Sequence, residues 1–267
     1  MKKIPTRIAL CIRVGLTLCA CVAAAAIFWR MFSDVGSDQL SNAIVTLTLC
    51  IAAALIVFRI PTLIHEMGHV IFGLCAGLKV RQVCIGWLSF GSDGVKICLS
   101  RAQEGETRLS LKEKEGAHAK LIAATLGGPA LELLFSAVFF TLYFLFPHNE
   151  ICIALSVFGV FALSEAICEL LPAEFAVGKT DGMVLSELFH KTGETEISLR
   201  LMQAQCIIEK EGIAKVPREI LFDVPVVRED SLSFIELLRM RIEYCRATGD
   251  ETVAAATRER LERIQND

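Results

Sequence analysis

The sequence has no stripe of basic residues and no stretch in which aromatic and basic side chains alternate. Its 27 lysines and arginines are slightly outnumbered by 30 aspartates and glutamates, so the net charge is −3. Proteins that bind nucleic acid concentrate positive charge on one surface, because they neutralise backbone phosphates. The composition therefore excludes nucleic acid from the expected partners.

The sequence also has no pair of cysteines spaced as CxxC, and its eleven cysteines form no regular framework. The number is odd, and several cysteines lie inside apolar runs. Cys19 and Cys21 are too close in sequence for an ordinary disulfide bond. We therefore interpret the cysteines as small, reduced apolar residues in a membrane interior rather than as a disulfide scaffold.

Apolar residues dominate, at 54% of the chain, with a mean hydropathy of +0.53. They gather in four runs, each long enough to cross a hydrocarbon core of about 30 Å. The runs are Ile8–Phe32, Ala43–Leu78, Ala119–Phe146 and Ile151–Leu171. After Asp181 the composition is that of a soluble helical protein. The expected fold is mainly α, a polytopic membrane helical bundle of about four spans with a small β-hairpin and a helical cytoplasmic tail.

Lysine and arginine alternate between the segments that connect these runs. The N-terminus, residues 79–117 and the tail contain many, whereas Ser33–Asn42 and Pro147–Glu150 contain none. Positive residues stay on the cytoplasmic side of a membrane. The pattern predicts a multi-pass membrane protein with both termini in the cytoplasm, and the expected location is a bacterial cytoplasmic membrane. We divide it into an N-terminal span and outer loop (1–42), a membrane core (43–190) and a tail (191–267).

The first run has a second interpretation. A basic start followed by Leu18-Cys19-Ala20-Cys21 resembles a lipoprotein signal, and Ala23–Ala26 resembles a cleavage region. In this interpretation the first span would be removed. The apolar run continues beyond it, however, and Trp29-Arg30 is typical of a helix end anchored at the membrane surface. These features favour a retained helix.

The second run is too long for one straight crossing, and Arg59 and Pro61 mark the expected bend. Beyond it, Val83–Phe90 and Val95–Leu99 are predicted strands joined by a turn at Gly91–Gly94. This hairpin either caps the membrane domain or offers an open edge to an extended peptide. Residues 101–116 are expected to form a polar connector.

Two further features concern the later part of the chain. Gly127-Gly128-Pro129 is expected to interrupt the third span near its start. In the tail, Ser231–Arg246 and Glu251–Ile264 have the apolar spacing of two amphipathic helices around Gly249. We expect these helices to pack on each other, with binding of a partner protein as the alternative.

The strongest chemical signal is the HEMGH motif, His65-Glu66-Met67-Gly68-His69. Histidines four residues apart share one face of a helix, so both imidazoles can reach a single Zn²⁺. Glu66 can then act as general base on a water molecule whose pKa the metal lowers. The chain has only five histidines, and ionisable groups inside an apolar run are costly and mark function.

Catalytic zinc needs a third protein ligand and an open fourth position. The other histidines are poor candidates, because His118 opens the third span, His148 lies on the far side and His190 lies in the tail. Four acidic residues near the cytoplasmic face remain open as ligands, namely Glu165, Glu169, Glu174 and Asp181. Depth in the membrane favours Asp181.

Four stretches of the sequence together resemble the motifs of one protein family. They are the HEMGH motif, the strand with Gly86 and Phe90, Gly127-Gly128-Pro129, and Leu170-Leu171-Pro172 followed by Thr180-Asp181-Gly182. Over residues 43–189 the chain resembles the site-2 protease family of intramembrane zinc metalloproteases. The resemblance implies that His65, His69 and Asp181 bind zinc, and that Glu66 is the base for cleaving a peptide bond in or beside a membrane helix.

The chain departs from the family's pattern in several places. Glu169 stands where the second motif has asparagine, the gap from Pro172 to Asp181 is enlarged, and Glu132 stands near the Gly-Pro element where asparagine is common. The resemblance implies that these regions position substrate. The assigned positions are Glu169, Pro172, Gly128, Pro129 and Gly182. Residues 79–117 are too few for a PDZ module, so substrate choice must rest on the hairpin, the membrane domain or the tail.

The sequence therefore predicts a zinc metalloendopeptidase of regulated intramembrane proteolysis. Its expected partners are the lipid bilayer, a single-span membrane protein or peptide as substrate, and a protein partner for the tail. One alternative is a catalytically silent, zinc-stabilised membrane protein with a binding or regulatory role. Another is a soluble helical metallopeptidase.

Overall fold

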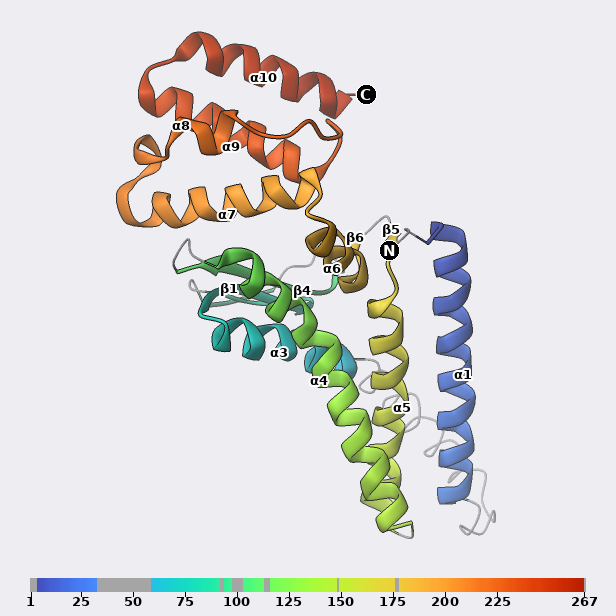
Figure 1. Cartoon of the computed structure of the whole chain (residues 1–267). Coiled ribbons are helices and arrows are strands. Elements are labelled where there is room, and N and C mark those ends of the chain that lie inside the picture. Colours follow the sequence, from blue (N-terminus) through green and yellow to red (C-terminus); the bar gives the residue numbers. More distant parts are fainter. Residues whose placement is uncertain are drawn as a thin grey trace. The chain divides into compact units, whose positions relative to one another are not determined.

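The computed structural model describes residues 4–32, 59–91, 94–97, 103–112, 116–147, 149–175 and 178–266. It is mainly helical, with one four-stranded sheet and one two-stranded sheet (Figure 1). The chain divides into two compact units. The first unit comprises Met1–Ala76, Val80–Arg108 and Ala123–Leu185, and the second comprises Gly77–Lys79, Leu109–Ile122 and Ser186–Asp267.

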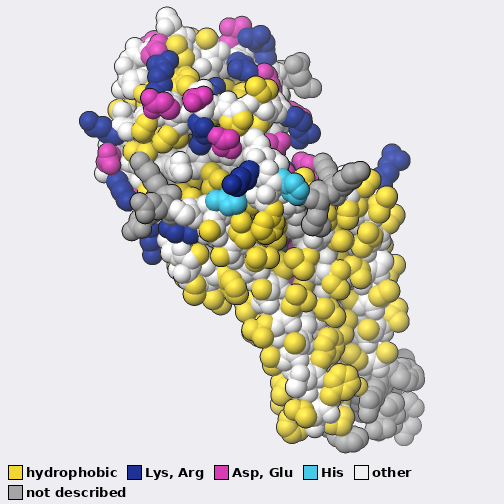
Figure 2. Space-filling model, viewed as in Figure 1, with side chains coloured by type: hydrophobic (Ala, Val, Ile, Leu, Met, Phe, Trp, Pro, Cys, Tyr) yellow, Lys and Arg dark blue, Asp and Glu magenta, His cyan; other side chains and the backbone are white. Residues whose placement is uncertain are grey.

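Three helices are long and apolar enough to span a membrane. They are α1 (Thr6–Phe32), α4 (Ala117–Leu145) and α5 (Glu150–Leu170). Figure 2 shows apolar side chains covering these helices with few charges among them. A water-facing surface seldom exposes so many large apolar groups together. The prediction of helices that are long and apolar enough to span a membrane is confirmed for these three runs.

The second predicted span is described only in part. Its residues 43–58 lie outside the described residues, as do the outer loop Ser33–Asn42 and His148. The remaining part forms α3 (Arg59–Cys75), which carries the HEMGH motif. Pro61, the expected site of a bend, is buried in the first described turn of α3, where a missing backbone donor costs little.

Helix α5 is the common neighbour of the helices in the first unit. Both α1 and α3 pack against it, and Ala24 of α1 meets Val157 of α5 in a small apolar cluster. Between α4 and α5, the Ser136 hydroxyl donates a hydrogen bond of 2.9 Å to the Gly159 carbonyl oxygen. Small residues at this crossing allow the two helices a close approach.

The region after α3 differs from the predicted hairpin. Its strands are β1 (Leu78–Gly86), β2 (Leu88–Gly91), β3 (Gly94–Ile97) and β4 (Gln103–Leu111), in the order β3-β2-β1-β4. The prediction of one strand over Val83–Phe90 is wrong, because the chain reverses at Gly86-Trp87 and Ile85 pairs with Leu88. Gly86 has φ +58°, a conformation that glycine adopts without steric cost.

The polar connector predicted for residues 101–116 is also wrong over most of its length. Gln103–Leu111 forms β4, which pairs with β1 at the edge of the sheet. Its composition contains too few apolar residues for a hydrophobic pattern to reveal a strand. Sheet pairing with β1 supplies the stabilisation that the sequence pattern does not indicate.

The expected interruption of the third span is wrong as well. Helix α4 runs without a break through Pro129, which lies buried inside it. A proline inside a membrane helix is tolerated where neighbouring groups satisfy the freed carbonyl oxygen. Gly127 and Gly128 therefore serve helix contacts rather than a chain break.

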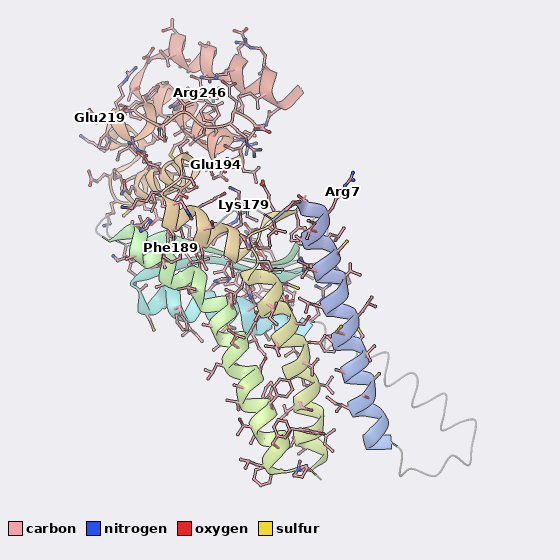
Figure 3. The ribbon with its side chains drawn as sticks, turned by 45° about the vertical axis from the view of Figure 1, so that its right-hand side comes forward. Arg7, Lys179, Phe189, Glu194, Glu219 and Arg246 are labelled. Carbon is pink, nitrogen blue, oxygen red and sulfur yellow. The ribbon has the colours of Figure 1, made fainter. Side chains whose placement is uncertain are left out.

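The tail helices are confirmed. They are α9 (Leu232–Thr248) and α10 (Glu251–Asn266), with Gly249 in the left-handed conformation between them. The other helical elements of the second unit are α7 (Gly193–Glu211), η1 (Ile213–Lys215) and α8 (Arg218–Phe222), and α6 (Asp181–His190) crosses from the first unit. The apolar faces of α7, α8, α9 and α10 form one core around Leu237. Charged residues such as Glu219 and Arg246 line the outside (Figure 3), which supports internal packing of the tail.

The apolar helices predict how the protein behaves on extraction. We expect the full chain to stay in the membrane pellet after an alkaline carbonate wash and to be released by detergent, because α1, α4 and α5 are long and apolar enough to span the bilayer. Immunoblotting of the two fractions measures this, with a soluble protein of the same cells as control. Release by carbonate alone would contradict the membrane assignment.

Candidate metal centre

The two histidines of the HEMGH motif share one face of α3. Their rings lie one helical turn apart, with centroids 4.6 Å from each other. The Nε2 atom of His65 is 3.0 Å from the Nε2 atom of His69. Helical spacing of four residues accounts for this approach, as the sequence predicted.

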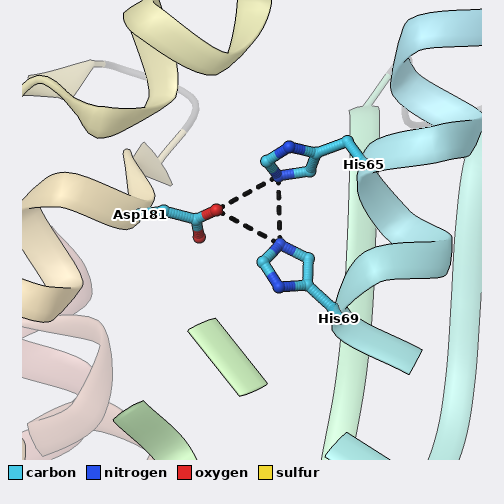
Figure 4. Close-up of side chains that lie close together, drawn as sticks. All are labelled: His65, His69 and Asp181. Carbon is cyan, nitrogen blue, oxygen red and sulfur yellow. Dashed lines mark hydrogen bonds and ion pairs between the residues drawn. The ribbon is translucent and has the colours of Figure 1, made fainter. Parts of the chain in front are cut away.

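Asp181, the first residue of α6, completes the group (Figure 4). Its Oδ2 atom lies 3.2 Å from His65 Nε2 and 3.3 Å from His69 Nε2. The side chains are largely buried, with 9%, 12% and 15% of their surface exposed for His65, His69 and Asp181. The three residues thus offer one ligand atom each to a common point and are able to hold a metal ion.

The other ring nitrogens determine which atoms face this point. His69 Nδ1 is 2.8 Å from the carbonyl oxygen of Ala124, which can only accept, so Nδ1 carries the proton. His65 Nδ1 is 3.1 Å from Glu132 Oε2 and donates to that carboxylate in the same way. Both Nε2 atoms therefore present lone pairs to each other and to Asp181 Oδ2.

Three facing lone pairs repel one another unless a proton or a cation lies among them. Asp181 Oδ2 is buried and makes no hydrogen bond of good geometry within the described residues. In a tetrahedral zinc site with bonds of about 2.0–2.1 Å, neighbouring ligand atoms are about 3.3 Å apart. The observed separations of 3.0, 3.2 and 3.3 Å fit that geometry. The residues therefore fit a metal ion with three protein ligands.

The structure does not bring the other candidate ligands to this point. Glu165 accepts a hydrogen bond of 3.4 Å from Thr62, and Glu174 lies in the short strand β5 (Glu174–Phe175). His118 faces the carbonyl oxygen of Leu188, and His190 faces that of Ser186. Among the described residues, the metal-binding group consists of His65, His69 and Asp181.

The segment before Asp181 is built to place it. Strand β5 pairs with β6 (Gly178–Lys179), and the Thr180 hydroxyl donates to the Ala173 carbonyl oxygen at 2.9 Å. The same hydroxyl oxygen accepts the Met183 backbone N–H at 3.3 Å and so caps α6. A side chain at Gly182 would collide with the Leu170 carbonyl group. The start of α6 is thereby held tightly against the end of α5.

The charge state of Asp181 suits a ligand. Burial acts to raise the pKa of its carboxyl group, but when the imidazoles of His65 and His69 carry protons in place of a metal ion, their hydrogen bonds and positive charge outweigh burial and leave this pKa below its ordinary value. A metal ligand must be deprotonated. Asp181 is therefore poised as an anionic oxygen donor.

Glycines bring α4 close to the histidines. A Cβ atom on Gly128 would lie 2.7 Å from His69 Nε2 and 2.8 Å from His65 Cε1. Side chains at Gly68 or Gly127 would collide with the backbone of the facing helix. The Gly127-Gly128-Pro129 element thus lies directly beside the centre, and any larger residue at 128 would displace the imidazoles.

Glu132 is the outer partner of His65. It is fully buried in α4, and its Oε2 atom accepts the hydrogen bond from His65 Nδ1. A carboxylate behind a metal-bound histidine fixes the ring orientation and strengthens its donor atom. Glu132 therefore supports the ligand rather than replacing it.

Glu66 lies under strand β4. Its side chain is buried, with 4% of the residue exposed, and its Oε2 atom accepts a short hydrogen bond from the Thr107 hydroxyl. A side chain at Gly105 would collide with Glu66 Oε1. The backbone of β4 therefore passes directly over the carboxylate that was predicted as the base.

Glu132 and Thr107 were not predicted from the sequence as partners of the HEMGH motif. Glu132 has a usable signal, because it is an isolated charge in an apolar run. Thr107 has none, since it lies in the segment that was predicted as a connector. Of the predicted positioning residues, Gly128 faces the two imidazoles and Gly182 directly follows Asp181. Gly128 and Pro129 are in α4, and Glu169, Pro172 and Gly182 flank the segment that ends in Asp181.

No family model, no curated protein and no solved structure matches this chain. The functional interpretation therefore depends on the geometry of the centre.

The outer role of Glu132 predicts a graded loss of metal. Glu132→Ala should weaken zinc binding by about 10- to 100-fold, as loss of such a partner usually does. Glu132→Gln keeps an oxygen acceptor for His65 Nδ1 and should lose less. Competition with a chromophoric chelator on the detergent-purified chain measures both. Ser136→Ala, which removes another buried polar group of α4, is the control, and an equal loss there would refute the specific role of Glu132.

Proposed function

We propose that this chain is an intramembrane zinc-dependent endopeptidase that cleaves a peptide bond in or next to a membrane helix. The observation that carries the proposal is the convergence of His65 Nε2, His69 Nε2 and Asp181 Oδ2 on one point. A buried glutamate adjoins the first ligand in sequence. Three metal ligands and a neighbouring carboxylate are the minimum set of groups that metal-assisted hydrolysis requires.

The donor set favours zinc. Two imidazole nitrogens and one carboxylate oxygen form a mixed N/O set of the kind found in catalytic zinc sites. Structural zinc sites usually have four protein ligands, and within the described residues only three converge here. A fourth position is thereby left for water, which hydrolysis requires.

Glu66 is the proposed base. When bound, zinc would supply Lewis acidity that makes a water molecule acidic and polarises the substrate carbonyl. The Glu66 carboxylate accepts the proton of the attacking water and delivers it to the amine that leaves. Burial excludes bulk water from Glu66 and so strengthens these interactions.

The fold also suggests how a substrate is presented. Strand β4 is an edge strand of its sheet, and its residues Gly105 and Thr107 lie at Glu66. A transmembrane helix must be locally unwound before its peptide bond is accessible. An unwound, extended segment added along β4 would run past the proposed base. A single-span membrane protein or a membrane-inserted peptide is the matching substrate class.

One observation favours a second function. The Glu66 carboxylate is engaged by Thr107 and covered by β4, an arrangement that suits a site closed to substrate. The alternative is a zinc-stabilised membrane protein that binds or regulates a partner without turnover. The two functions differ in whether a peptide bond is cut.

Substitution of Glu66 separates them. Glu66→Gln should abolish cleavage of a single-span reporter while leaving bound zinc unchanged, because the amide cannot take a proton and Glu66 is not a ligand. Reporter fragments and zinc content are measured on the same preparations. Glu196→Gln, in α7 of the second unit, is the control and should cut like the wild type. Undiminished cleavage by Glu66→Gln would remove Glu66 as the base, and no cleavage by the wild type would favour the silent function.

A further inference from the structure

A charged residue lies inside the first membrane helix. Arg13 is the only ionisable side chain other than cysteine between residues 8 and 27, and it is partly buried. A guanidinium in an apolar span is costly and is retained where it has a specific partner. Arg13 is therefore expected to serve something beyond anchoring the helix.

The N-terminal end of α1 contacts the segment that leads to Asp181. The Arg13 guanidinium carbon lies 5.6 Å from the ring centroid of Phe175, within range of a cation–π interaction. The Ile4 backbone N–H donates to the Pro172 carbonyl oxygen at 2.9 Å. The Thr6 hydroxyl donates to the Glu174 carbonyl oxygen at 3.2 Å. Three separate contacts thus tie α1 to one short segment.

The contacted segment leads directly to the ligand. Strand β5, which contains Phe175, pairs with β6, and the Ala173 backbone N–H donates to the Thr180 hydroxyl oxygen at 3.1 Å. Thr180 immediately precedes Asp181 and caps α6. The order of contacts is therefore Arg13 in α1, Phe175 in β5, and Thr180 before the first residue of α6.

We propose that Arg13 is a positioning residue for the metal ligand Asp181. Its guanidinium packs on Phe175 in the segment before that ligand, and the pairing of β5 with β6 and the contacts of Thr180 connect this segment to the start of α6. The inference rests on the metal centre of the proposed function, but not on turnover. It also makes α1 a permanent part of the centre, in contrast to the interpretation of this segment as a removable signal.

Zinc affinity tests the role of Arg13 directly. In chelator competition with the full detergent-purified chain, Arg13→Gln should weaken zinc binding about tenfold, at the lower end of the effect of outer partners. Arg13→Lys keeps the positive charge and should retain most of the affinity. Arg7→Gln is the matched control on the same helix, since Arg7 is exposed and points away from the bundle (Figure 3). Equal affinities for Arg13→Gln and the wild type would overturn the proposal.

A double-mutant cycle shows whether Arg13 acts through Phe175. If it does, Arg13→Gln should weaken binding by clearly less than tenfold in a Phe175→Leu background, because the ring on which the guanidinium packs is gone. Full additivity of the two losses would refute this route. Each variant is first checked for a monodisperse gel-filtration peak, and the comparison of Arg13→Lys with Arg13→Gln keeps the test valid if the glutamine variant folds poorly.

The readout distinguishes this proposal from the proposed function. If Arg13→Gln loses zinc affinity while the wild type cuts no reporter, the positioning role stands and the protease activity fails. If the wild type cuts the reporter while Arg13→Gln binds zinc like the wild type, the activity stands and the positioning role fails.

Discussion

The structure of the first unit depends on one constraint: the lone pairs of three ligand atoms must face one another in a buried place. His65, His69 and Asp181 face each other at 3.0–3.3 Å, an arrangement that a low-dielectric interior tolerates only with positive charge between them. Close helix contacts at glycines bring α4 to the imidazoles, and the capped start of α6 brings the carboxylate. The packing of the unit thus holds the three ligands in place.

One of the two glutamates that stand where the resembled motifs have amides acquires a physical role in this arrangement. Glu132 accepts a hydrogen bond from His65 Nδ1 and so orients that ligand. Glu169 lies in the last turn of α5, before the segment that leads to Asp181. Arg13 of α1 contacts the same segment through Phe175, so the placement of the third ligand involves both helices.

Much of the centre could be predicted from the sequence, because helical periodicity places His65 and His69 on one face and hydropathy identifies the spans. Asp181 could be favoured only with the help of depth and the motif resemblance, since it is distant in sequence. The strand β4 could not be predicted, because pairing with β1 rather than its own pattern stabilises it. Contacts such as Thr107 with Glu66, or Arg13 with Phe175, join residues far apart in the chain, and no local pattern encodes them.

The central claim is that these three side chains bind one zinc ion. X-ray absorption spectroscopy at the zinc edge, on the full chain purified in detergent and loaded with one equivalent of zinc, tests it most directly. The account predicts two imidazole nitrogens and one or two oxygens at about 2.0–2.1 Å and no sulfur, with one imidazole lost in His69→Ala. Sulfur ligands, or an imidazole count that His69→Ala leaves unchanged, would contradict it.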